Sequence, residues 1–112
     1  MDIKPESPVI DFVVQTALKY LNLSKVVLFG SRARGDARER SDFDFAIFAN
    51  NVTQDSRARV LLDIDENPVT LLGIDVIFWN DSLNIDLKEK ILKEGIIVYD
   101  NTGIRQNSDK SS

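Results

Sequence analysis

Four short runs of apolar residues, mostly β-branched or aromatic, most constrain the fold of this chain. They cover residues 25–29, 43–49, 74–79 and 96–99, and each is too short to be an ordinary helix. In the segments around them, apolar residues recur every three or four positions, as on one face of a helix. This alternation predicts a single α+β domain: a mixed sheet of about four strands, with helices packed mainly on one face.

Three longer helices are expected between and before these strands. Their apolar spacing covers residues 8–21, 53–65 and 83–94. An arginine-rich segment without large apolar residues, residues 31–41, is expected to be a loop with at most one helical turn. Hydroxyl side chains are good N-caps and glycine is a common C-cap. The residues expected at the helix ends are Ser7, Ser82 and Gly95.

The chain length suits one domain, residues 1–100, followed by a polar tail, residues 101–112, that we expect to be disordered. No apolar run approaches the roughly 18–20 residues of a membrane span. The N-terminal residues, with Asp2 and Glu6, do not resemble a signal peptide. We therefore expect a cytoplasmic protein. Its net charge of −4 argues against direct nucleic-acid binding over a generally basic surface.

The chain contains neither cysteine nor histidine. This excludes disulfides, zinc sites built on thiolates or imidazoles, cysteine nucleophiles and any Ser-His-Asp triad. Any catalysis must therefore depend on carboxylates, hydroxyls, lysine or arginine side chains and a bound ion.

Three aspartates lie in or beside the predicted strands. Asp42 and Asp44 are two residues apart and should point to the same face, away from the apolar side chains that alternate with them. Asp75 lies inside the third apolar run. If these strands are neighbours, the three carboxylates converge, and oxygen ligands of this kind select Mg²⁺ or a similar hard cation. The alternative is that Asp42 caps a turn while the others point outward from a solvated edge.

A loop rich in arginine precedes the first two aspartates. It begins at Gly30 and Ser31, and it contains four of the seven arginines of the chain, at positions 32, 34, 38 and 40. A serine at the start of a short helix and a local positive charge suit the binding of a polyphosphate. The alternative is a solvated loop whose arginines pair with nearby acids such as Asp36 and Glu39.

Together, the two segments 28–36 (LFGSRARGD) and 41–47 (SDFDFAI) resemble the signature of the DNA polymerase beta-like nucleotidyltransferases. The short length and the Ala-Arg-Gly sequence are similar to the minimal nucleotidyltransferase (MNT) branch of that superfamily. The resemblance extends from about Leu23 to Asp100.

The resemblance implies a site and a reaction. Asp42, Asp44 and Asp75 would be catalytic and would hold Mg²⁺, in a two-ion site. The reaction is attack of an acceptor hydroxyl on the α-phosphorus of a nucleoside triphosphate, with release of pyrophosphate. The residues implied in nucleotide binding are Gly30, Ser31, Arg34 and Gly35.

Within this family the short chain suggests an antitoxin that transfers AMP from ATP to a HEPN-type partner protein. About 35 residues follow Asp75, too few for a separate acceptor-binding domain. Two alternatives remain: a nucleotidyltransferase acting on a small molecule such as an antibiotic, and a non-catalytic subunit that binds nucleotide. A nucleic-acid polymerase is disfavoured by the negative net charge.

Overall fold

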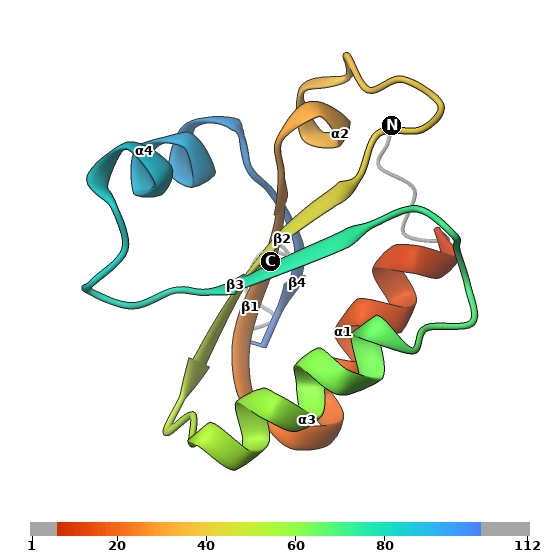
Figure 1. Ribbon diagram of the computed structural model, residues 1–112. Coiled ribbons are helices and arrows are strands. Elements are labelled where there is room, and N and C mark those ends of the chain that lie inside the picture. The colour runs from red at the N-terminus through yellow and green to blue at the C-terminus, as the bar shows by residue number, and fades with distance from the viewer. Residues whose placement is uncertain (1–6, 102–112) are drawn as a thin grey trace, which may run out of the picture.

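The computed structural model describes residues 7–101, which form one mixed sheet with helices on both of its faces (Figure 1). Of the expected tail, residues 101–112, only Asn101 belongs to the described residues. In chain order the elements are α1 (Pro8–Tyr20), β1 (Asn22–Phe29), α2 (Ser31–Arg34), β2 (Phe43–Asn50), α3 (Gln54–Asp65), β3 (Ile74–Phe78), α4 (Ile85–Glu94) and β4 (Ile96–Asp100).

The four strands lie in the order β3-β2-β1-β4. β1 is antiparallel to both β2 and β4, whereas β2 and β3 run parallel and are connected through α3. The predicted four-stranded mixed sheet is therefore confirmed. The parallel register sets Phe43 opposite Ile74 and Asp44 opposite Asp75.

Two apolar clusters cover the two faces of the sheet. The larger lies under α1 and α3 and includes Phe43, Phe45 and Ile47 from β2. The smaller lies under α4 and joins Ala46 of β2 to Ile91 of α4. Figure 1 shows α1 and α3 together on one side of the sheet and α4 on the other. Strand alternation in β2 explains both clusters, because successive side chains point to opposite faces.

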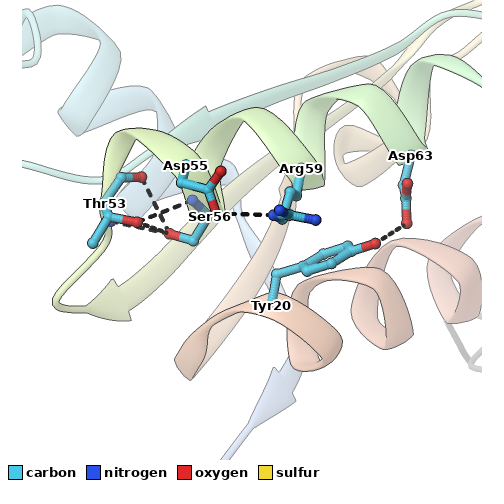
Figure 2. A network of polar contacts seen from close by, with 6 residues as sticks. All are labelled: Tyr20, Thr53, Asp55, Ser56, Arg59 and Asp63. Carbon is cyan, nitrogen blue, oxygen red and sulfur yellow. Dashed lines mark hydrogen bonds and ion pairs between the residues drawn. The ribbon is translucent and has the colours of Figure 1, made fainter.

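A polar network links α1 to α3 at the surface (Figure 2). The Tyr20 hydroxyl donates a hydrogen bond of 2.9 Å to Asp63 Oδ2. At the start of α3, Thr53 and Ser56 form a reciprocal capping box, which satisfies backbone N–H groups that lack helical partners. These contacts fix the packing of the two helices that support the larger cluster.

The helix ends agree with the sequence at Ser7 and Gly95 and differ at Ser82. Ser7 caps α1 as expected. Asn84 and not Ser82 caps α4. The Asn84 side-chain oxygen accepts a hydrogen bond of 2.8 Å from the backbone N–H of Asp86. The Ser82 backbone N–H donates to the side-chain oxygen of Asn80, two residues earlier. Gly95 does follow α4, but with an extended backbone and without the left-handed cap geometry. Glycine is required there for space, since a Cβ would collide with the Ile91 carbonyl oxygen.

In residues 7–101, no helix has the length and apolar character that crossing a membrane requires.

The Tyr20–Asp63 contact gives a first prediction. Tyr20→Phe keeps the ring but removes the donor to a partly buried carboxylate, so the free energy of unfolding should fall by about 1 kcal/mol. Urea denaturation measures this change. The other tyrosine supplies the control, because Tyr99 packs against the larger cluster and Tyr99→Phe preserves that packing. Equal losses in the two variants would show that the Asp63 contact contributes nothing specific.

Candidate active site

Two carboxylates lie side by side near the start of the parallel strands. Asp44 of β2 and Asp75 of β3 are direct register partners. Alternation along each strand places both on the face that carries Ala46 and α4, and away from the larger cluster. The two side chains are close enough to share a hydrogen bond when one is protonated. The two strands are neighbours, which was the condition set for the carboxylates to meet.

The surroundings of Asp44 disfavour its negative charge. Partial burial raises the pKa of the Asp44 carboxyl above its ordinary value, and the charge of Asp75 raises it further, with a smaller contribution from Asp42. The positive charge of Lys90 on α4 offsets part of this rise. A partly buried carboxylate next to a second acid is stabilised by a bound cation.

Asp42 lies just before β2 and is held differently. Its Oδ1 accepts a hydrogen bond of 3.1 Å from the backbone N–H of Gly73, at the entrance to β3. A Cβ at Gly73 would lie 2.7 Å from the same oxygen, so only glycine allows this approach. Within residues 7–101, no three acidic side chains are grouped closely enough to hold a metal ion. The structure thus pairs Asp44 with Asp75 and places Asp42 beside them, turned to a backbone amide.

Gly30 brings the loop against this pair. It is the N-cap of α2, with φ of 78°, and a Cβ there would collide with Asp44 Oδ2. Ser31, predicted as the cap, is instead the first residue of the four-residue helix. The main chain at Gly30 lies close to the Asp44 carboxylate. Glycine allows this approach because it has no side chain. Gly35 ends the helix in the left-handed conformation, at φ of 87°.

Two of the four arginines of the loop, Arg32 and Arg34, already have partners. Arg34 pairs with Asp36 at 3.1 Å and with Glu94 of α4 at 3.0 Å, and these contacts raise the pKa of its guanidinium. Arg32 donates to the Ser41 carbonyl oxygen at 2.8 Å and lies over the Phe43 ring. The alternative of pairing with nearby acids therefore holds for Arg34 and Asp36. Arg32 instead secures the loop to the strand that follows.

Lys90 is a site residue that the sequence analysis missed. Its positive charge lowers the pKa of Asp44, against the effects of burial and of Asp75. Leu87, Lys90, Ile91 and Glu94 share one helix face, at spacings of three and four, and this face points to the sheet and the loop. The signal was present in that spacing, but it has meaning only once α4 is known to cover the face that carries Asp44.

Comparison with known proteins identifies the family. Residues 13–103 match the family described as Polymerase beta, Nucleotidyltransferase. The chain belongs to this family. The resemblance drawn from the glycine-serine turn and the paired aspartates is thereby confirmed.

Among relatives of this nucleotidyltransferase is a Methanocaldococcus jannaschii protein that is named, provisionally, a protein adenylyltransferase. It is 30% identical over 98 residues, which cover 84% of this chain and 97% of the relative. Two solved structures share the fold. One is a toxin-antitoxin with AMP-PNP, with a TM-score of 0.63, 18% identity and coverage of 81% of this chain and 73% of the other. The second is a tri-AMPylated Shewanella oneidensis HEPN toxin in complex with an MNT antitoxin, with a TM-score of 0.59, 15% identity and coverage of 88% and 75%.

The two glycines of the nucleotidyltransferase loop offer a matched test. Both have positive φ, but only Gly30 lacks room for a Cβ; nothing lies within 4 Å of a Cβ at Gly35. Gly30→Ala should therefore lower the free energy of unfolding by about 2–4 kcal/mol, from backbone strain plus displacement of Asp44. Gly35→Ala should lower it by about 1–2 kcal/mol, from backbone strain alone. Denaturant titration of both variants checks the order, and a larger loss at Gly35 would contradict the geometry.

The raised pKa of Asp44 makes its ionisation unfavourable in the folded state. Its destabilising effect is absent below the ordinary pKa of aspartate and is fully present above the raised folded pKa. In metal-free buffer at pH 7, Asp44→Asn should raise Tm by a few degrees at most, since solvent screens a half-buried group. The gain should vanish as the pH falls below about 4.

Thermal melts at several pH values test this. The control is Asp81→Asn, at an exposed aspartate in the turn before α4. A Tm gain that is independent of pH, or equal in the control, would rule out relief of charge at Asp44.

Proposed function

We propose that this protein is an Mg²⁺-dependent nucleotidyltransferase that transfers AMP from ATP to a hydroxyl group of a HEPN-type partner protein. Family membership supplies the reaction class. The name of the archaeal relative supports a protein acceptor, and the structures with AMP-PNP and with an AMPylated HEPN toxin support adenine nucleotide and a HEPN partner.

The observation that carries the proposal is the register of Asp44 and Asp75 beside Gly30. A partly buried carboxylate beside a second acid lowers stability, because burial and the charge of Asp75 both raise the pKa of Asp44. Because Gly30 has no side chain, the main chain of the loop lies directly against Asp44. The main chain and the carboxylates can therefore meet the same ligand, as a metal-bound triphosphate requires.

The residues present fit a magnesium ion. Asp44 and Asp75 offer adjacent carboxylate oxygens, and Asp42 would join them by exchanging the Gly73 amide for the ion. An oxygen-only donor set suits Mg²⁺. When bound, the ion would neutralise phosphate charge and stabilise the attacking and leaving oxygens.

The residues of the chain would bind and orient the triphosphate and accept the proton of the acceptor hydroxyl. Ser31 and the backbone around Gly30 and Gly35 would contact the phosphates, and Arg34 would exchange its carboxylate partners for phosphate oxygens, which carry more charge. The acceptor oxygen forms a bond to the α-phosphorus while the bond from that phosphorus to the bridging oxygen breaks, and pyrophosphate leaves. The hydroxyl proton passes to solvent or to Asp75, which is exposed.

Substitution of the carboxylates tests this function. Wild-type protein, ATP and Mg²⁺ should add the mass of one or more AMP groups to the HEPN-type protein encoded by the neighbouring gene. Asp44→Asn should lower the transfer rate at least about 1000-fold, as expected when a metal ligand is lost, and EDTA should abolish transfer. Asp81→Asn should retain the wild-type rate.

Three outcomes would contradict the proposal. Wild-type protein that leaves the partner mass unchanged excludes protein adenylylation. AMP transfer to an aminoglycoside but not to the partner favours the small-molecule alternative. Protection of cells from the partner by an Asp42→Asn, Asp44→Asn double variant favours the non-catalytic alternative.

A further inference from the structure

The loop between α3 and β3, residues 66–73, presents apolar side chains to solvent. Leu71 is fully exposed, at 105% of its reference area, and Val69 is also exposed. A single exposed apolar residue is ordinary, but a leucine with no protein contact at its side chain, in a short loop that also exposes a valine, is unusual. We refer to residues 66–73 as the β3 entry loop.

The β3 entry loop is held in place by its own hydrogen bonds. Asn67 Oδ1 accepts from the N–H groups of Val69 at 3.0 Å and Thr70 at 2.9 Å, and the Asn67 amide donates to the Ile64 carbonyl oxygen. Thr70 Oγ1 accepts from the Leu72 N–H at 3.0 Å. Exposure of Leu71 is therefore a property of a defined conformation, as in loops that present a binding residue on a rigid scaffold.

The loop leads directly into the active site. Gly73 ends it and donates to Asp42, and Asp75 follows two residues later. Four residues of chain span at most about 14 Å, so Leu71 lies within that distance of Asp75. A hollow of about 310 Å³ lies beside the loop, with Asp65, Leu71, Gly73 and Ile74 in its lining. A protein bound on this loop would bring its surface next to the carboxylates.

Charge beside the loop indicates the chemistry of a partner. α3 ends in Asp65 and Glu66, both exposed, and has no basic residue in its last turn. Negative charge is unfavourable at the C-terminus of a helix. Neither side chain forms an ion pair with any residue between positions 7 and 101. A basic partner surface would satisfy both.

We propose that the β3 entry loop is the docking surface for the protein that carries the acceptor hydroxyl. Leu71 would enter an apolar depression of that protein, and basic side chains at its rim would face Asp65 and Glu66. A second copy of this chain is disfavoured as occupant, because a two-fold contact through this surface would bring the same acidic residues together. The inference deepens the proposed function and rests on its protein acceptor.

Binding measured without transfer tests the surface separately from the chemistry. In an Asp44→Asn background, calorimetry with the purified HEPN-type partner should show at least tenfold weaker binding for Leu71→Asp, equal to about 1.4 kcal/mol. Leu92→Asp is the matched control: Leu92 is a 67% exposed leucine on α4, outside the loop, and its change should alter affinity less than twofold. Leu71→Met should bind as tightly as the parent.

A second variant tests the charges. Asp65→Lys combined with Glu66→Lys should slow association with the partner and reduce its dependence on salt. Leu71→Asp, with Asp44 retained, should leave both the affinity for ATP and the Tm of the protein unchanged. These two measurements separate lost docking from lost folding.

The proposal is overturned if Leu71→Asp binds the partner like its parent, or if the partner does not bind at all. It is also overturned if light scattering shows that the chain forms dimers that Leu71→Asp dissociates, since the occupant is then a second copy. Tight, Leu71-dependent binding without AMP transfer by wild-type protein would support the docking surface while contradicting the proposed function.

Discussion

The parallel pairing of β2 with β3 is the constraint on which the site depends. It sets Asp44 opposite Asp75, and burial on both faces of β2 keeps it in register. Phe45 and Ile47 are fully buried on one face and Ala46 on the other. A slip of one residue would turn the phenylalanines toward α4 and the aspartates into the larger cluster. The apolar core therefore stabilises a register that repulsion between the two carboxylates disfavours.

The site concentrates features that lower stability. Asp44 is partly buried beside a second acid, Gly30 has a backbone that other residues rarely adopt, and α3 ends in acids without an ion pair to residues 7–101. None of these supports the fold. The proposed metal-bound nucleotide would account for the first two, and a basic partner surface for the third. Strain and like charges that persist in a small domain mark the positions where function outweighs stability.

The sequence allowed the strands and the sheet type to be predicted, because alternation and run length depend only on local chemistry. It marked Asp44 and Asp75 as carboxylates that meet if their strands are neighbours, and the register supplies that condition. It did not predict that Asn84 would cap α4, because Ser82, two residues earlier, is an equally good N-cap type. It also missed the tight packing at Gly95 and the charge of Lys90 near Asp44, which depend on how α4 lies against the sheet. The partner of Asp42 was also missed, since the Gly73 amide reaches it only after β3 pairs with β2.

The residues around the carboxylate pair differ in charge between the side of α2 and α4 and the side of the β3 entry loop. This difference favours a separate direction of approach for the nucleotide and for the acceptor protein. Arg34 and Lys90 supply positive charge from the loop and from α4, and Arg34 joins these two elements through Glu94. A triphosphate is attracted to that side and repelled by Asp65 and Glu66 beside the β3 entry loop. The acceptor protein proposed above would meet the reverse arrangement, an apolar and acidic surface. Attack on the α-phosphorus with pyrophosphate leaving on the far side requires this separation, because the acceptor oxygen and the leaving group must lie in line across the phosphorus.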